Sequence, residues 1–316
     1  MNVISKILVL IFILLLTISI KANAHPWGGL VIDNEGNIYF TFICPMEDSE
    51  NHYACVWKLT PDNKITHILS SQQSPSDIVL SRNPNREIFA AERSGQNPRH
   101  SNSFWKIENS GNQLLIPRNT NHDQFYIQSI AVNKSQGIFF AKENNLYYRD
   151  GSNSVEKITN QSFERIGLTS WGKDEKLYFM SGDDIFVYDG TEYKLVISDL
   201  RKENPENLPF SGANIFFDMA VDENNNIFLA YYGNREVIKI SSDGVVETIL
   251  KSEEPWSPHG IDIFNGEIYI LESTIIGDNW WKFWKENPGI IPRVRKISSN
   301  GSISTVYNFA NNLKNE

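Results

Sequence analysis

The stretch Ala220-Val221-Asp222-Glu223-Asn224-Asn225-Asn226-Ile227-Phe228-Leu229 joins two apolar segments through a polar turn. Two short apolar segments around an Asp- and Asn-rich turn are typical of a β-hairpin. The second apolar segment recurs in five further copies, which begin at Asn37, Glu87, Gly137, Lys176 and Glu267. Self-similarity of this kind indicates a repeat architecture, in which each unit buries its apolar face against its neighbours.

Each copy is followed by two further apolar segments separated by a turn. In the fifth unit these are Val237-Ile238-Lys239-Ile240 and residues 245–250, with Asp243-Gly244 between them. Four strands in each of six units, with almost no helical periodicity, predict an all-β fold: a six-bladed β-propeller with four antiparallel strands per blade. We expect a single domain over residues 25–316, with blades at roughly residues 27–70, 76–117, 127–159, 165–198, 214–251 and 257–309.

The ends of the repeat indicate how the ring closes. The sixth unit contains its own fourth strand, between Ser302 and Tyr307, and little chain precedes Trp27 in the first unit. No segment is therefore left over to complete another blade. We expect blades of contiguous sequence and a ring closed by packing between blades one and six.

The first 24 residues have the pattern of a cleavable signal peptide. Lys6 precedes an apolar run from Ile7 to Ile20, and Ala22-Asn23-Ala24 provides small residues for cleavage. The run is short for a membrane span, so an anchored protein is the weaker alternative. We expect a secreted or periplasmic protein without a stable membrane anchor after cleavage.

Charge and cysteine content narrow the class of partner. The formal net charge is −9, which disfavours nucleic acid because such partners require clustered Lys and Arg. The only two cysteines, Cys44 and Cys55, bracket one loop, and an exported protein is expected to pair them in a disulfide. Their spacing matches neither a CxxC pattern nor a zinc pattern.

Unequal loops indicate which side of the ring binds a ligand. The connections from the second to the third strand are long in blades one, two and six, which are neighbours in a closed ring. Long loops on a rigid scaffold commonly carry binding residues. We expect a small-molecule, glycan or peptide site there, with ligand contacts from Trp280, Trp281, Trp284, Arg93 and Glu272. The alternatives are that the tryptophans pack down as a lid over the channel and that the charges are solvated.

The phrases Ala220-Val221-Asp222-Glu223-Asn224-Asn225-Asn226-Ile227-Phe228 and Val237-Ile238-Lys239-Ile240-Ser241-Ser242-Asp243-Gly244 resemble NHL-repeat propellers and the related gluconolactonase (senescence marker protein) superfamily. The resemblance extends over the whole chain after residue 24. It implies the propeller fold, but a range of activities, because the superfamily includes calcium-dependent lactonases, a zinc-dependent amidating lyase and many binding proteins.

The resemblance also implies where a metal would bind, since these enzymes carry metal ligands at the starts of their inner strands. His259 lies at such a position, and the matching positions hold Gly28, Ser76, Gln128, Ile166 and Phe217. Neither enzyme's complete ligand set is present. Asp218, one residue after its matching position, replaces part of the set if the register shifts by one. The implied site has calcium or zinc on His259 with Asp218 or Gln128, and His259 and Asp218 act in catalysis; the alternative is a hydrogen-bonded structural histidine.

His25 suggests a second metal option. Cleavage after Ala24 would make His25 the N-terminal residue, whose α-amine and imidazole together chelate copper(II). The alternative is a terminal histidine left by chance.

Together these observations predict an exported NHL- or gluconolactonase-like propeller with a ligand site over blades six, one and two. If it is an enzyme, we expect a metal-dependent hydrolase of lactonase or esterase type, or a lyase. The alternative is a non-catalytic propeller that binds a glycan, peptide or protein. The sequence contains no GxSxG, HExxH, Walker or dinucleotide motif.

Overall fold

The structure is a computed structural model of the whole chain. It describes residues 29–43, 54–71, 76–94, 101–121, 125, 129–142, 144–160, 162–172, 174–200, 216–274 and 292–308. None of these residues forms a helix long and apolar enough to cross a membrane.

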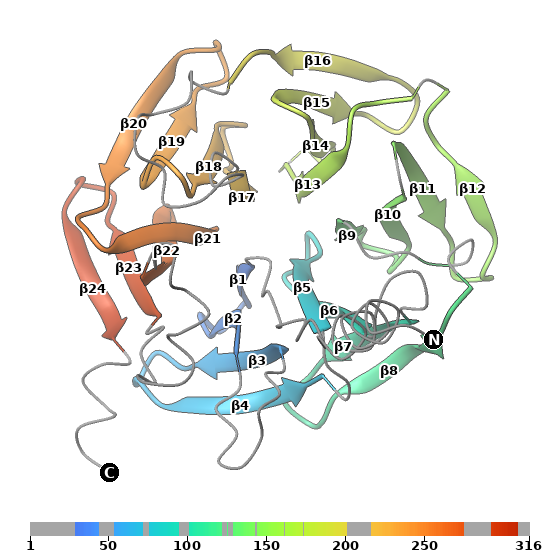
Figure 1. The fold of residues 1–316 in the computed structure, drawn as a ribbon, viewed down its shortest axis with the longest axis horizontal. Helices are drawn as coiled ribbons and strands as arrows, with labels where there is room; N and C mark the ends of the chain where they lie inside the picture. Colours follow the sequence, from blue (N-terminus) through green and yellow to red (C-terminus); the bar gives the residue numbers. More distant parts are fainter. Residues whose placement is uncertain are drawn as a thin grey trace, which may run out of the picture.

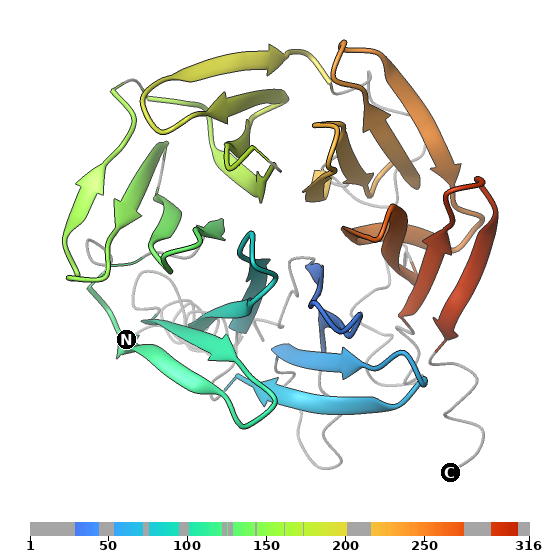
Figure 2. The same ribbon diagram turned by 180° about the vertical axis from the view of Figure 1, so that it is seen from behind.

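The described chain forms six four-stranded antiparallel sheets arranged in a ring (Figures 1 and 2). Each sheet consists of four consecutive strands, the first innermost and the fourth outermost, so the six-bladed propeller expected from the repeat is confirmed. Blade one is β1 (Leu30–Ile32), β2 (Ile38–Ile43), β3 (Ala54–Leu59) and β4 (Ile65–Ser70), and blade two is β5 (Ser76–Arg82), β6 (Ile88–Ser94), β7 (Ser101–Ile107) and β8 (Gln113–Asn119). Blade three is β9 (Ile130–Val132), β10 (Ile138–Lys142), β11 (Asn145–Arg149) and β12 (Val155–Lys157), and blade four is β13 (Ile166–Trp171), β14 (Leu177–Ser181), β15 (Asp184–Tyr188) and β16 (Tyr193–Ile197). Blade five is β17 (Phe216–Val221), β18 (Ile227–Tyr231), β19 (Glu236–Ile240) and β20 (Val246–Lys251), and blade six is β21 (Trp256–Phe264), β22 (Glu267–Thr274), β23 (Arg293–Ile297) and β24 (Ile303–Asn308).

The polar turn of the repeat is a hydrogen-bonded structure of its own. In blade five, Oδ1 of Asp222 accepts hydrogen bonds from the backbone N–H groups of Asn224 and Asn226, both at 2.8 Å. Asn225 has a φ of 61°, a left-handed conformation that Asn tolerates better than most residues. The turn therefore reverses the chain between β17 and β18, and Asp33 makes the same pair of bonds between β1 and β2.

The core lies between neighbouring blades. Between blades two and three, Phe125 packs edge-on against Phe104 and Phe140, with ring centroids 5.5 and 5.6 Å apart, and all three are fully buried. Each blade therefore depends on its neighbour to bury its apolar face, as the repeat pattern predicts.

Blades six and one close the ring without exchanging a strand. Their contact is an apolar cluster that includes Leu30, Phe40, Leu271 and Val294. The expectation of contiguous blades joined by packing is confirmed.

Blade two departs from the loop lengths expected from the sequence. Part of its predicted loop is strand, because the β6–β7 ladder continues through the pairs Arg93–Asn102 and Ser94–Ser101. Only residues 95–100 connect these strands, whereas residues 44–53 connect β2 to β3 and residues 275–292 connect β22 to β23. The longest connections between a second and a third strand therefore belong to the adjacent blades six and one.

Candidate functional site

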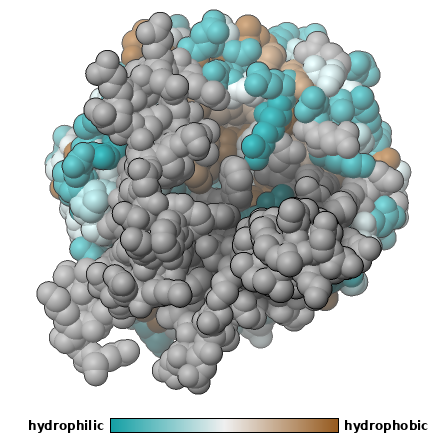
Figure 3. Space-filling view, viewed as in Figure 1, coloured by the Kyte–Doolittle hydropathy of each residue, from teal (hydrophilic) through white to brown (hydrophobic). Residues whose placement is uncertain are grey.

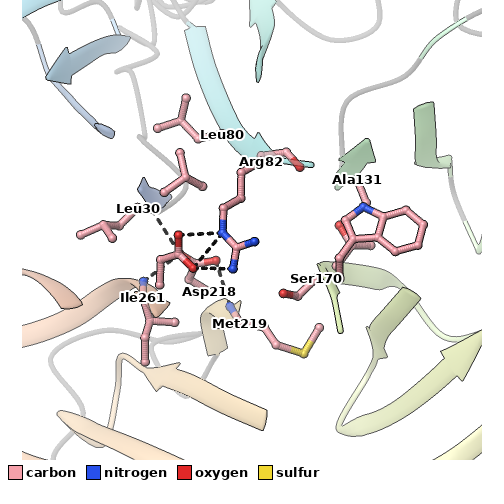
Figure 4. A pocket seen from close by; sticks show the side chains of 13 residues that line it. Leu30, Leu80, Arg82, Ala131, Ser170, Asp218, Met219 and Ile261 are labelled. Atoms are coloured by element: carbon pink, nitrogen blue, oxygen red, sulfur yellow. Dashed lines mark hydrogen bonds and ion pairs between the residues drawn. The ribbon is translucent and has the colours of Figure 1, made fainter. Parts of the chain in front are cut away.

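The inner strands of the six blades surround a narrow channel, and Asp218 binds two of them. An inner strand is the edge of its sheet, so its channel-facing N–H groups lack a ladder partner. Asp218, on β17 of blade five, accepts hydrogen bonds at Oδ2 from Ile261 N of blade six at 2.9 Å and from Leu30 N of blade one at 3.3 Å. This single carboxyl group connects three blades around the axis (Figure 4).

Burial dominates the electrostatics of Asp218. Oδ1 accepts a further bond from Met219 N at 2.9 Å, and these N–H groups favour the charged carboxylate. Removal from water outweighs them, and the nearby Asp262 carboxylate adds to the effect, so the pKa of Asp218 is raised to about 7. Near neutral pH this carboxyl group exists in both protonation states.

Asp262, on β21, forms a second polar connection around the axis. Its Oδ2 accepts a hydrogen bond from Ile32 N of blade one at 2.9 Å. Arg82, on β5 of blade two, donates to the same carboxylate from Nε and from Nη2, each at 2.8 Å. Arg86 lies 3.7 Å from Asp262 and donates to the carbonyl oxygens of Ile32 and Ile263. Blades six, one and two are therefore held together by charged side chains as well as by apolar packing.

A cavity of about 40 Å³ lies in the channel, and residues of all six inner strands line it. Its polar lining includes Arg82, Ser170, Thr169, Asp218 and Asp262, and apolar side chains such as Leu30 and Met219 complete it (Figure 4). A cavity of this size holds roughly three water molecules. In the space-filling view, the described part of the outer rim is largely hydrophilic (Figure 3).

His259 lies on β21 at a β-bulge, between the ladder residues Pro258 and Gly260. The side chain is 4 % exposed, and its Nε2 has no hydrogen-bond partner among the residues that the structure describes. Burial lowers the pKa of His259 to about 4, so the imidazole is neutral at physiological pH. Buried ring nitrogens usually have a hydrogen-bond partner, so His259 is a candidate residue of the functional site.

The same bulge occurs in blades four and five, and it corrects the predicted register. The ladder shifts between Ile166 and Leu168 in β13 and between Phe216 and Asp218 in β17. The positions equivalent to His259 are therefore Gly167 and Phe217, and the expected match of Ile166 is wrong by one residue. Asp218 is equivalent to Gly260, one residue beyond the histidine position, so the shifted register that would have placed Asp218 at that position does not apply in blade five.

Glu272, predicted as a ligand contact, is fully buried and paired. It lies on β22, where Oε2 accepts a hydrogen bond from Nε of Arg293 at 2.5 Å and Oε1 accepts one from the hydroxyl of Ser252. Arg293 also stacks over Trp256, with 4.2 Å between the guanidinium carbon and the ring centroid. The interpretation of Glu272 as a solvated charge is wrong, because strand β23 places an arginine directly beside it.

Blade two contains a second copy of this arrangement. Glu92 occupies the same position of β6 and is 2 % exposed. It accepts hydrogen bonds from the hydroxyls of Ser71 and Ser103, at 2.6 and 2.9 Å, and from Arg118 at 2.6 Å. Arg93, the other predicted ligand contact of this blade, forms an ion pair with Asp77 at 2.5 Å and remains partly exposed.

Several predicted residues lie outside the described residues. They are His25, Cys44, Gln128, Trp280, Trp281 and Trp284. Cys55 is fully buried on β3, and its disulfide with Cys44 stays a prediction.

The described members of the predicted metal site do not fit a metal centre. His259 offers a neutral, unpartnered nitrogen, as a metal ligand should. Asp218 does not offer an unoccupied ligand atom, because both of its oxygens accept backbone hydrogen bonds. Within the described ranges, no group of three or more His, Cys, Asp or Glu side chains could hold a metal ion.

Sequence reasoning missed Asp262 and Arg82. The available signal was a charge inside an apolar inner strand, as in Ile261-Asp262-Ile263 and Leu80-Ser81-Arg82. A charged residue at a buried strand position requires a partner. The sequence could therefore mark both residues, but it did not show that they bind each other.

Comparisons with known proteins agree with this architecture. No family model and no curated protein matches the sequence. Among solved structures, a protein of unknown function from Bacteroides thetaiotaomicron is similar with a TM-score of 0.54 and 12% identity, over 80% of this chain and 67% of the other. A gluconolactonase from Xanthomonas campestris is similar with a TM-score of 0.51 and 12% identity, over 79% and 84%. A catalytically inactive histidine-to-alanine variant of virginiamycin B lyase from Staphylococcus aureus, with quinupristin, is similar with a TM-score of 0.51 and 11% identity, over 91% and 85%.

The chain shares the six-bladed propeller fold of these enzymes. The expected resemblance to gluconolactonase-like propellers is thus confirmed at the level of the fold. At this identity the likeness carries no residue role and no substrate from those proteins to this chain.

Proposed function

We propose that this protein is a small-molecule hydrolase or lyase that acts beside the central channel, with His259 as its catalytic base. The observation that carries the proposal is the Nε2 atom of His259, which is buried, neutral and without a hydrogen-bond partner. A buried imidazole nitrogen without a partner costs free energy, and a substrate group would satisfy it.

The chemistry follows from the neutral imidazole. Its free nitrogen takes a proton from a carbon next to a carbonyl in a lyase reaction, or from water in hydrolysis. The pKa of about 4 makes His259 a weak base in the free protein. A substrate that brings a negative charge close to the ring would raise that pKa and strengthen the base.

Substrate binding is assigned to the long connections of blades six and one. In this proposal Trp280, Trp281 and Trp284, which lie outside the described residues, would supply aromatic surface for a ring-containing ligand. Arg93 on β6 of blade two, which is paired with Asp77 and partly exposed, would add a polar contact. A cyclic ester or lactone presents both an apolar ring and a carbonyl. Support for this class comes from two solved propellers of the same fold, a gluconolactonase and virginiamycin B lyase with quinupristin.

The test is a turnover assay of the purified protein against a panel of lactones, aryl esters and cyclic depsipeptides. His259→Gln and His259→Ala should reduce turnover by about 100-fold or more, as expected for loss of a general base. His67→Gln is the matched control, because His67 lies on the outer strand β4 and should leave turnover unchanged. Equal turnover by the wild-type protein and the His259 variants would refute the proposal.

A metal-dependent mechanism is the alternative within the enzymatic hypothesis. In it the Nε2 atom of His259 would bind the metal instead of acting as a base, together with Gln128 or, for copper, His25, which lie outside the described residues. Elemental analysis of the purified protein for calcium, zinc and copper tests this, because a stoichiometric ion should be lost in His259→Ala. Retention of the ion in that variant would place the metal elsewhere.

A non-catalytic binding protein is the competing function. In its favour, Arg93 and Glu272 are engaged in ion pairs, so neither side chain is free to act as an acid or a base in catalysis. Saturable binding of a panel compound, peptide or glycan without turnover, unaffected by His259→Gln, would support this alternative.

Export remains part of the proposal and is tested separately. The supporting observation is the sequence of residues 1–24. N-terminal sequencing of the protein from its native host should begin at His25. Mass spectrometry under non-reducing conditions should show Cys44 and Cys55 in one disulfide-linked peptide.

A further inference from the structure

We propose that the cavity of the central channel binds one small monovalent anion, held between Arg82 of blade two and Ser170 of blade four. This site is independent of the proposed catalytic role of His259. Its ligand is of the size of chloride, bromide or formate.

The two carboxylates that line the cavity already accept hydrogen bonds. Asp262 accepts from Arg82, Ile32 N and Ile263 N, and both oxygens of Asp218 accept backbone N–H groups. The carboxylates that line the cavity are thus occupied. A cation would have to compete with these bonds for its ligands.

Two donors remain free on opposite sides of the cavity. Arg82 uses Nε and Nη2 for Asp262, while Nη1 has no hydrogen-bond partner among the described residues. In Figure 4 this nitrogen points away from the carboxylate, toward the side of the cavity where the Ser170 hydroxyl points inward. Ser170 likewise makes no side-chain hydrogen bond within the described ranges, and both residues line the cavity. A guanidinium nitrogen and a hydroxyl that converge on one space form an anion site.

The charges around the cavity are close to balance. Arg82 is paired with Asp262, and Arg86 interacts with Asp33 and Glu223 as well as with Asp262. Because burial raises the pKa of Asp218 to about 7, that carboxyl is only partly charged at neutral pH. Its protonated form removes a negative charge that would repel an anion.

The size of the cavity limits the ligand. About 40 Å³ accommodates a monatomic anion or one of three heavy atoms, together with few water molecules. Larger anions such as methanesulfonate should be excluded. This exclusion separates specific binding from a general salt effect, which depends on ionic strength and not on the size of the anion.

The experiment uses the full purified protein in two measurements. Thermal unfolding is followed in sodium chloride and in sodium methanesulfonate at equal ionic strength, and crystals are soaked in sodium bromide. We expect chloride to raise the unfolding temperature in a saturable manner, because a ligand of the native state stabilises it by mass action. We expect an anomalous bromide peak between Arg82 Nη1 and the Ser170 hydroxyl.

Ser170→Val is the main variant, because it removes one donor and narrows the cavity without disturbing the bonds between Arg82 and Asp262. It should weaken the chloride effect about tenfold or more, as expected for one lost hydrogen bond and the added bulk. Ser242→Val, at an exposed turn, is the matched control and should retain the full effect. Equal unfolding temperatures of the wild-type protein in both salts, a chloride effect unchanged in Ser170→Val, or bromide bound only outside the channel would each overturn the proposal.

Discussion

Asp262 of blade six and Arg82 of blade two are bound to each other across the edge of blade one, with 2.8 Å between Oδ2 and Nε. Their side chains are 4 % and 15 % exposed. The pair therefore bridges the junction at which the ring closes, where no strand is exchanged between blades. Apolar packing between blades six and one is supplemented there by a buried ion pair.

We predict that Asp262→Ala destabilises the protein by about 3–5 kcal/mol, because it leaves the buried Arg82 guanidinium and Ile32 N without their partner. Urea unfolding followed by tryptophan fluorescence measures the change. Asp243→Ala, at an exposed turn, is the control and should change stability much less. A similar small effect for Asp262→Ala would show that the ion pair does not stabilise ring closure.

Asp218 should make stability depend on pH. Its pKa is about 7 in the folded protein, compared with an ordinary value of 3.8, so the native state binds the extra proton. The contribution to stability is fully present below about pH 4 and is lost as pH rises through 7. The free energy of unfolding of the wild-type protein, relative to that of Asp218→Asn, should fall by up to about 4 kcal/mol over this range. Urea unfolding of both proteins from pH 4 to pH 8 tests this, and a difference that does not vary with pH would contradict it.

His259 should remain neutral well below the usual range of histidine. Burial lowers its pKa from 6.5 to about 4, so the unfolded chain takes up a proton that the native state does not. The contribution of His259 to stability is present above pH 6.5 and is lost as pH falls toward 4. Imidazole ¹⁵N chemical shifts, assigned by comparison with His259→Gln, should show no protonation of this ring at pH 6. Protonation near pH 6.5 would mean that the ring is in contact with water.

Glu272 and Glu253 both pair with Arg293, but they should differ in importance. Glu272 is fully buried, whereas the Glu253 side chain is 58 % exposed. Glu272→Ala should destabilise the protein by about 3–5 kcal/mol, because it leaves Arg293 buried over Trp256 without its inner partner. Glu253→Ala should change stability by about 1 kcal/mol or less, as is usual for an exposed pair. Equal losses in urea unfolding of the two variants would contradict this ranking.

The sequence predicted the architecture because the determinants of a blade are local. A turn such as Asp222–Asn226 and the apolar segments on either side specify a hairpin without reference to the rest of the chain. Repetition of that local pattern required the blades to stack, and the contiguous fourth strand of blade six excluded a strand exchange. His259 could be identified from the sequence for the same reason, because counting residues along the repeat places it at the start of an inner strand.

The channel could not be predicted in this way. Asp218, Asp262 and Arg82 are separated by long stretches of chain, and their partners are backbone N–H groups that become available only at the edges of the inner strands. The β-bulges in β17 and β21 shift Asp218 one position beyond the position equivalent to His259. Such bulges cannot be predicted by counting residues along the repeat. Local hydrogen bonding and apolar periodicity, which the sequence contains directly, determined the blades. Only the closed ring brings the side chains of blades five, six, one and two around one axis and removes them from water, and that burial decides their charges, their partners and the chemistry open to them.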